Sequence, residues 1–310
     1  MALRYDEIGQ RLRAFRLASG LSADEVADRL GISRTALYRF EKGELAKIET
    51  LERLSELLNV SLPTLLGVGI EYLRSAVAYF ERLRQLEEDA EHIVVLSGPI
   101  SFLLGSSNFE MSLEQVLRES IPDDLPNRPK ALADVDRIME ILHERKRAYQ
   151  ERRPPIVNLI SAMQIEPFVS NGMIGRVSLT ERQKAVRRDM ARAEIEHFAS
   201  IADEESIGVQ IGLVTDSLPH LGFHIFKRRS GDVLTISPFR LGERPNIRVG
   251  IAMVTSAPEA VCLHNDVVRE AWRTAIKGRE AAAYLRELLA RASETERRAR
   301  APRTTATTRP

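Results

Sequence analysis

Apolar residues in the first 68 positions recur every three or four residues in short segments, which is the spacing of helices that bury one face. The first segment contains Ile8, Leu12 and Phe15 and ends at Ser19-Gly20, a typical helix stop. Ser22 followed by Glu25 is the signature of a capping box at the start of the second. These start and stop signals predict five compact helices, at residues 5–19, 23–30, 34–42, 50–58 and 61–66.

The pattern changes after this compact unit. Ile70, Leu73, Val77 and Phe80 continue the three-to-four spacing without a stop signal, so we expect one longer helix over residues 70–91. Two interpretations remain open for this helix: it packs on the second domain of its own chain, or it also pairs with a second subunit. The sequence therefore divides into a compact helical domain at 1–68 and a linker or dimerisation helix at 69–92.

The remainder mixes both kinds of secondary structure. The apolar run at 92–105 is broken by Gly98-Pro99 and predicts a buried strand and a turn. Turn residues separate the later strand-like runs, so we expect part of their sheet to be antiparallel. We predict strands at 207–214, 222–227, 232–239 and 247–255, and helices at 131–152, 178–201, 258–276 and 279–292. This is an α+β domain at 93–292, followed by a disordered basic tail at 293–310.

Composition limits the classes of function. In 310 residues, 45 basic and 44 acidic side chains leave a net charge of +1, so any affinity for nucleic acid has to be local. A single cysteine, Cys262, excludes a disulfide framework and a four-cysteine zinc site. No stretch reaches the ~18 uninterrupted apolar residues of a membrane span, and the N-terminus lacks the apolar core of a secretory signal. We expect a soluble cytoplasmic protein without a membrane partner.

The most informative stretch is residues 21–66. It resembles the Xre-type, phage-repressor-like family of helix-turn-helix transcriptional regulators, and the C-terminal domain is not recognised. The resemblance covers about a fifth of the chain and implies an all-α, five-helix, DNA-binding domain ahead of the linker helix and the α+β domain. The matching residues are Leu21-Ser22, Val26-Ala27, Leu30-Gly31-Ile32-Ser33, Tyr38, Phe40-Glu41-Lys42-Gly43, Leu51, Leu54 and Leu57-Leu58.

The same pattern has a physical reason. Ala27 is small where the second and third helices cross, and burial of Leu37 turns the polar side of the third helix outward. A helix with that face fits the major groove, where Arg34 is the first candidate to read guanine through two donors. The resemblance also implies that Ser22 lies near a DNA phosphate. The candidate DNA-binding residues are Ser22, Ser33, Arg34, Thr35, Tyr38, Arg39 and Lys42.

Further basic residues are candidates for phosphate contacts. Arg11, Arg13 and Lys47 join Lys42 in this group. Residues 1–68 carry ten basic and ten acidic side chains, so contact with DNA depends on how these charges are segregated. One unit reads only a few base pairs, and we therefore expect a homodimer on a palindromic operator.

Residues of the second domain suggest several kinds of chemistry, each weak. Ser97 and Ser101 lack the lysine motif of a self-cleaving peptidase. His224, Lys227 and Asp232 come near the order of a phospholipase-D-type phosphodiesterase, but the first two face opposite sides of a regular strand. Cys262 and His264 lack further metal ligands. We expect no enzyme activity, no cofactor and no metal.

The remaining possibility is a pocket for an unknown small-molecule or protein effector. Candidate lining residues are Phe223, Phe226, Phe239 and Trp272, and an anionic effector would meet Arg240, Arg244 and Arg248. The sequence favours a transcriptional regulator controlled through its C-terminal domain. The alternatives are an antitoxin-like protein-binding module and a DNA-tethered phosphodiesterase-like enzyme.

Overall fold

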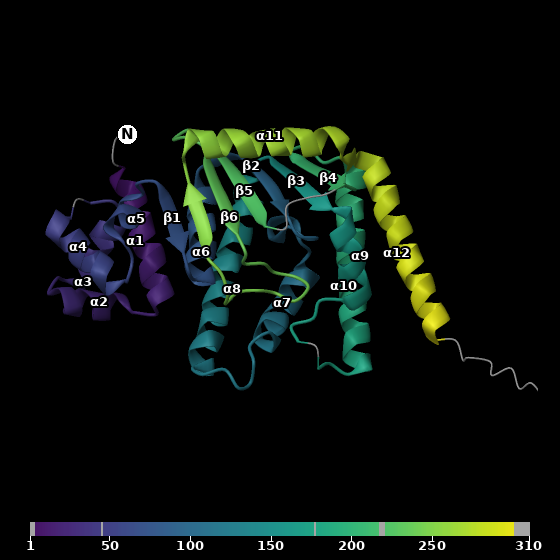
Figure 1. Ribbon diagram of the computed structural model, residues 1–310, viewed down its shortest axis with the longest axis horizontal. Coiled ribbons are helices and arrows are strands. Elements are labelled where there is room, and N and C mark those ends of the chain that lie inside the picture. The colour runs from purple at the N-terminus through teal and green to yellow at the C-terminus, as the bar shows by residue number, and fades with distance from the viewer. Residues whose placement is uncertain (1–3, 45, 177, 217–220, 301–310) are drawn as a thin grey trace, which may run out of the picture.

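The N-terminal part of the computed structural model is a compact group of short helices (Figure 1). The structure describes residues 4–44, 46–176, 178–216 and 221–300. Ser22, Ser33 and Ser61 each cap a helix by accepting a hydrogen bond from the backbone N–H three residues later. The helices are α1 (Tyr5–Ser19), α2 (Ala23–Leu30), α3 (Arg34–Glu41), α4 (Ile48–Leu57) and α5 (Leu62–Leu66).

The C-terminal domain is built on one eight-stranded sheet with the strand order β1-β7-β6-β5-β2-β3-β4-β8. β2, β3 and β4 are parallel, and the other pairings are antiparallel. The strands are β1 (Ile70–Leu73), β2 (Ala90–Ser97), β3 (Ile156–Ser161), β4 (Val209–Val214), β5 (Gly222–Arg228), β6 (Val233–Ser237), β7 (Ala252–Thr255) and β8 (Ile276–Lys277).

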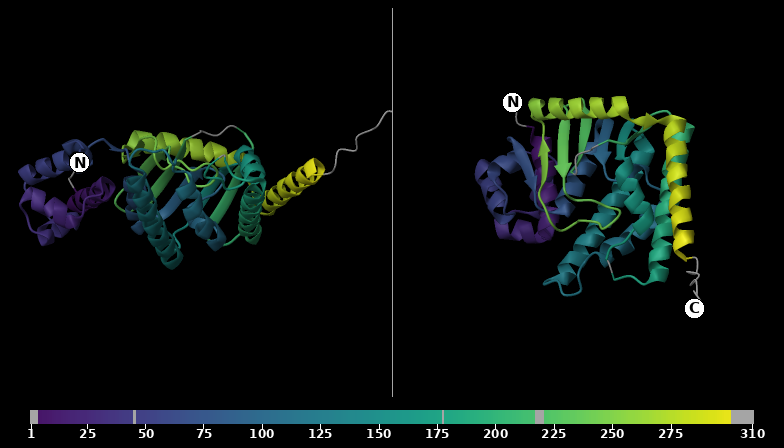
Figure 2. Two further views of the ribbon diagram at one scale, coloured as in Figure 1. Left: turned by 90° about the horizontal axis from the view of Figure 1, so that it is seen from below. Right: turned by 45° about the vertical axis from the view of Figure 1, so that its right-hand side comes forward.

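Helices cover both faces of this sheet (Figures 1 and 2). α11 (Pro258–Thr274) crosses one face and buries Val94, Leu159 and Ile225 beneath it. The other face carries the larger core and is covered chiefly by five helices, two of which follow β2 and two of which follow β3. They are α6 (Ala76–Glu88), α7 (Ser107–Glu119), α8 (Arg128–Arg152), α9 (Ala162–Asn171) and α10 (Glu181–Glu204).

The domain is therefore an α/β domain with a mixed sheet, not the α+β arrangement expected from the sequence. β5, β6 and β7 are antiparallel neighbours, as the turn residues indicated. The parallel centre was missed because β2 and β3 are buried on both faces, and such strands form continuous apolar runs that carry no sign of their direction.

The predicted single helix over residues 70–91 is wrong. Residues 70–73 form β1, which pairs with β7 through Ile70 opposite Thr255, and Glu71 and Leu73 are buried while Ile70 and Tyr72 are exposed. This alternation of buried and exposed residues has the period of a strand. The backbone N–H and C=O groups of β1 find their hydrogen-bond partners on the edge of β7. The helix begins only at Ala76, and nearly all of α6 is buried within the chain. It has no free face to offer a second subunit.

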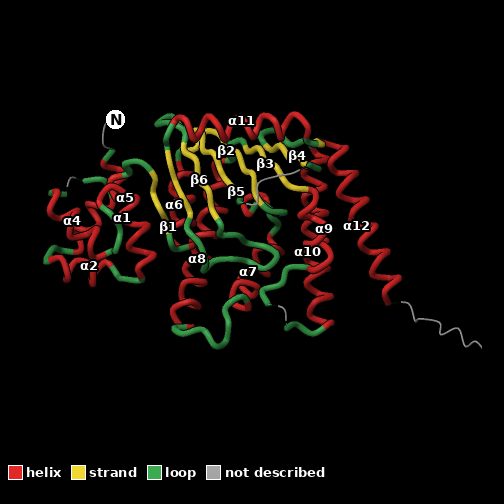
Figure 3. The backbone as a smooth tube through the Cα atoms, in the orientation of Figure 1, coloured by secondary structure: helices red, strands yellow, loops and turns green. Residues whose placement is uncertain are grey.

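The predicted tail also begins too early. α12 (Gly278–Arg300) continues as a helix beyond Ser293, at the edge of the domain next to α10 (Figure 3). Glu296 lies 3.2 Å from an Nη atom of Arg188 and 2.6 Å from one of Arg192 on α10, so these ion pairs hold the last turns. Residues 301–310 of the predicted tail lie outside the described residues. No helix in the described part of the chain has the length and apolarity needed to cross a bilayer.

Candidate functional site

The position of α3 is set by its buried side. Leu37 is fully buried, and Ala27 on α2 is 2% exposed where the two helices contact each other. Glu41 at the end of α3 accepts two hydrogen bonds from Arg16 of α1, with N–O distances of 2.5 and 3.0 Å, and both side chains are buried. A buried bidentate ion pair of this kind fixes orientation as well as distance. Sequence reasoning missed this pair because it assigned charged residues to the surface.

The opposite side of α3 is open to solvent. Ser33, the first residue of this face, is the N-cap and accepts a hydrogen bond from Ala36 N–H at 3.1 Å. In Figure 1, α3 lies on the side of the helical group away from the sheet domain. The candidate residues exposed here are Ser33, Arg34, Thr35, Tyr38, Arg39 and Lys42. They form one polar face of the kind that the sequence predicted.

The two arginines of this face are paired with neighbouring carboxylates. Arg34 donates to Asp24 Oδ2 and to the Tyr38 hydroxyl, each at 3.2 Å, and its guanidinium lies 5.3 Å from the centre of the Tyr38 ring. The hydrogen bond to Tyr38 and the charge of Asp24 raise the pKa of Arg34. Arg39 donates to Glu44 at 2.6 Å. All of these groups are exposed, so exchanging such partners for DNA costs little.

Ser22 does not offer its donors to a phosphate in this structure. Its N–H and its hydroxyl both donate to the Glu25 carboxylate at 2.8 Å, and the hydroxyl accepts from the Glu25 N–H. The backbone hydrogen bond from Ser22 lowers the pKa of Glu25, which keeps the carboxylate charged. The predicted capping box is confirmed, but it places an anion where a phosphate contact was expected. A phosphate would have to displace Glu25.

Arg11 cannot make the phosphate contact predicted for it. It is 7% exposed, and its Nε lies 2.5 Å from Oε1 of Glu71. Arg13 is half-exposed, with its Nε 3.4 Å from Glu81 of α6. Both therefore face the sheet domain, because α1 packs against α6. Lys47 is exposed at the N-cap of α4 and stays a candidate.

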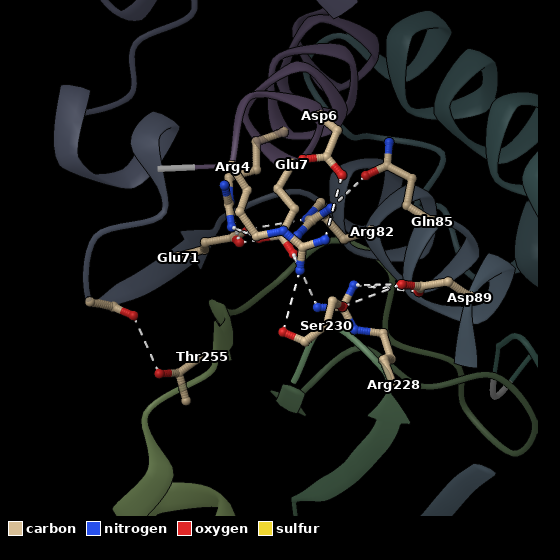
Figure 4. Close-up of polar contacts among 12 residues, drawn as sticks. Arg4, Asp6, Glu7, Glu71, Arg82, Gln85, Asp89, Arg228, Ser230 and Thr255 are labelled. Carbon is tan, nitrogen blue, oxygen red and sulfur yellow. Dashed lines mark hydrogen bonds and ion pairs between the residues drawn. The ribbon is translucent and has the colours of Figure 1, made fainter. Parts of the chain in front are cut away.

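A cluster of ion pairs joins α1 of the first domain to the sheet domain (Figure 4). Glu71 of β1 lies between Arg11 of α1 and Arg82 of α6. Arg82 donates to the two carboxylate oxygens of Glu71 at 3.0 and 3.1 Å. Burial opposes ionisation of Glu71, but the charges of Arg82 and Arg11 outweigh it and lower the pKa of this carboxyl. At the same junction Arg228 of β5 lies 3.2 Å from Glu7 of α1. These contacts hold α1 against β1, β5 and α6.

A cavity of about 500 Å³ lies on the α6 side of the sheet, at the ends of β2, β5 and β6. Of the predicted lining residues, Phe239, Arg240 and Arg244 are found there, together with Tyr79, Phe102 and His224. The prediction was wrong for the other aromatic residues. Phe223 packs on the opposite face of the sheet under α11, and Trp272 belongs to α11 itself. Phe226 belongs to the core, and Arg248 is exposed and does not line the cavity.

The other candidate groups are not assembled into sites. Lys227 pairs with Asp232 at 2.5 Å, whereas His224 lies on the other side of β5, 3.4 Å from the Tyr79 hydroxyl. Cys262 is exposed, and His264 Nδ1 lies 2.8 Å from the Ala260 carbonyl. In the described ranges no group of three possible metal ligands occurs.

Of the two serine candidates, only Ser101 has a side chain that the structure describes. Ser101 is buried, and no lysine in the described part of the chain hydrogen bonds to it. The side chain of Ser97 lies outside what the structure describes.

Comparison with known proteins identifies the first domain. The helix-turn-helix family model matches residues 12–65, so this part of the chain is a helix-turn-helix domain of the predicted kind. Among curated proteins, none matches the chain significantly. A solved structure of TrmBL2, described as an archaeal chromatin protein with a novel mode of DNA binding, shares 13% identity over 86% of this chain and 92% of its own, with a TM-score of 0.31. A TM-score at this level does not indicate a common fold.

Proposed function

We propose that this protein is a transcription regulator that reads operator DNA with α3 and is controlled through its sheet domain. The observation that carries the proposal is the exposed polar face of α3 within a helix-turn-helix domain. A helix of this kind inserts into the major groove, where arginine donors discriminate guanine. Arg34 is the proposed base reader, and Lys42 and Lys47 are proposed phosphate contacts.

The proposal includes two copies on a palindromic site. Residues 1–68 have equal numbers of acidic and basic side chains, so one copy gains little from net charge. One α3 also spans only a few base pairs, and two half-sites about one helical turn apart give the specificity that a single half-site lacks. We assign no interface to this homodimer, and α6 is excluded from it by its burial.

Control of DNA binding is proposed to pass through α6. One side of this helix lines the cavity with Tyr79, Phe80 and Leu83. Its other side reaches the DNA-binding domain, since Arg82 binds Glu71, which also pairs with Arg11 of α1, and the Gln85 side chain donates to the Gln10 carbonyl of α1 at 3.0 Å. An occupant of the cavity acts on DNA binding only if it prefers one position of α6 over another. The protein is proposed to act in the cytoplasm, without catalysis and without a cofactor.

Fluorescence anisotropy on DNA selected by the full-length chain tests this function. Arg34→Ala should weaken specific binding by about 10- to 100-fold and relax base preference at one position. Lys42→Ala should weaken selected and random DNA alike and reduce the slope of log affinity against log salt by about one. Arg273→Ala on α11 is the matched control, because this arginine is exposed and far from α3.

Three results would contradict the proposal. The first is the failure of the folded protein to select any DNA sequence. The second is an Arg34→Ala variant that binds as tightly as the control. The third is a monomer on the selected DNA in analytical ultracentrifugation, which would remove the homodimer.

A further inference from the structure

The cavity lies where α/β domains commonly bind ligands. Gly98 and Pro99, directly after the parallel strand β2, form part of its wall, and Met163 and Gln164, in the first turn of α9 after β3, form another. Ligands in open α/β sheets bind outside the carboxyl ends of such strands. The volume of about 500 Å³ falls within the ~300–1,000 Å³ range of small-molecule sites.

Five aromatic side chains contribute to the walls of the cavity. Tyr79 and Phe80 come from α6, Phe102 from the turn after β2, Phe109 from α7 and Phe239 from the segment after β6. The rings of Tyr79 and Phe239 lie 6.0 Å apart and tilted, so they form one continuous apolar surface. Such walls favour a ligand with a ring or another compact apolar body.

The polar groups inside the cavity are uncharged or already paired. The Tyr79 hydroxyl lies 3.4 Å from both His224 Nδ1 and Thr235 Oγ1. Burial, with a smaller effect from the Arg145 charge, lowers the pKa of His224 to about 3, which keeps the imidazole neutral. Arg145 is held by Glu87 at 2.6 and 2.9 Å. The interior therefore offers hydrogen bonds to a neutral group of the ligand.

Of the two arginines that line the cavity from the segment between β6 and β7, only Arg244 has an ion pair among the described residues, and that pair is long. Arg240 and Arg244 both line the cavity and are exposed. Arg240 Nε donates to the Arg244 carbonyl at 3.3 Å, and no carboxylate of the described residues lies within ion-pair distance of Arg240. The nearest carboxylate to Arg244 is that of Glu243 at 3.9 Å, and Glu243 is itself engaged by Asn171 at 2.8 Å.

We propose that this cavity binds a small organic carboxylate, with its ring body against the surface formed by Tyr79 and Phe239 and its acid group on Arg240 and Arg244. Binding itself stands on the cavity alone, and only its effect on DNA rests on the proposed function. The ligand contacts α6 directly, so its binding adds contacts to the helix that carries Arg82 and Gln85.

Isothermal titration calorimetry tests the proposal by titrating the full chain with two acids, each matched with its carboxamide. The pairs are naphthalene-2-carboxylate with its carboxamide, and cyclohexanecarboxylate with its carboxamide. At least one acid should bind about tenfold more tightly than its amide, which is the value of a charge-assisted hydrogen bond. Arg240→Gln and Arg244→Gln together should abolish this preference, whereas Arg248→Gln should keep it, because Arg248 is exposed and does not line the cavity.

A cavity-filling variant, Ile100→Trp, should lose affinity for acids and amides alike while melting as a folded protein. Equal affinity for acid and amide, no binding of either pair to the wild-type chain, or a preference that survives replacement of both arginines would overturn the proposal. Fluorescence anisotropy measures the affinity for selected DNA with and without the acid. This measurement separates ligand binding in the cavity from control of DNA binding through the cavity. An acid that binds without changing DNA affinity leaves the ligand class intact and removes control through the cavity, and absence of DNA binding removes only the proposed function.

Discussion

Arg11 on α1 and Glu71 on β1 form a buried ion pair, with 2.5 Å between Nε and Oε1, and this pair ties the helix-turn-helix domain to the edge of the sheet. Arg82 of α6 contacts the same carboxylate from the other side. Glu71 therefore pairs with two buried cations from two different elements, and Glu7 of α1 pairs with Arg11 as well, at 3.1 Å. The orientation of the DNA-binding domain relative to the cavity depends on this group.

Replacing that carboxylate should be costly. Glu71→Gln leaves the buried Arg82 without a counter-charge among the described residues and Arg11 with Glu7 alone, at 3.1 Å, and we expect a loss of about 3–5 kcal/mol in the free energy of unfolding. Urea denaturation followed by circular dichroism measures it. Glu91→Gln serves as control, since Glu91 pairs with Arg229 at the surface and should change stability by less than about 0.5 kcal/mol. Equal effects of the two substitutions would contradict the role given to Glu71.

Asp24 should restrain DNA binding. Its Oδ2 lies 3.2 Å from Arg34 Nη1, so it competes with DNA for this arginine and adds negative charge to the proposed interface. Asp24→Asn should tighten binding to selected DNA by about three- to tenfold at low salt, with a smaller gain at high salt. Anisotropy titrations at two salt concentrations measure the gain. Asp266→Asn on α11 is the control, and an unchanged affinity for Asp24→Asn would place α2 away from the phosphates.

Asn158 is a buried residue whose side-chain amide has no hydrogen-bond partner among the described residues. It lies on β3 between Val95 and Ile211, is 1% exposed, and neither amide atom has a hydrogen-bond partner among the described residues. Removing an unsatisfied buried amide is favourable, so Asn158→Val should raise the free energy of unfolding by about 1–2 kcal/mol. Thermal and urea melts of the same protein check this. A destabilised variant would indicate that the amide has a partner, such as a bound water.

Acid should destabilise the fold partly through His224. Its pKa is about 3 in the folded chain and near 6.5 when unfolded, so below pH 6.5 the unfolded state binds more protons. The stability contributed by neutral His224 is complete above pH 6.5 and falls by about 2 kcal/mol at pH 5. His224→Gln should flatten the stability curve between pH 6.5 and 5.

Burial also lowers the pKa of His92, so part of this slope should persist in His224→Gln. Urea titrations at pH 6.5, 5.8 and 5.0 follow the change. His143→Gln provides the comparison, because His143 is exposed on α8. If the two variants had the same pH dependence, His224 would not be the group that titrates.

The sequence by itself determined the helix-turn-helix domain. Its helix ends are set by local contacts, such as Ser22 with Glu25 and the left-handed Gly20 and Gly31, and residues so close in the chain can be recognised without knowing the fold. The buried face of α3 follows from the same periodicity, because Leu37 lies at the helical spacing of the core.

Only the tertiary structure decided the linker, the role of Arg11 and the lining of the cavity. Residues 70–73 form a strand because the edge of β7, which is far away in the sequence, supplies its hydrogen-bond partners. Arg11 is buried because Glu71 on that strand supplies its counter-charge. The cavity unites α6, the end of β2 and the segment after β6. Periodicity shows which residues are buried, but not against what, because pairings between distant segments depend on the whole sheet being assembled.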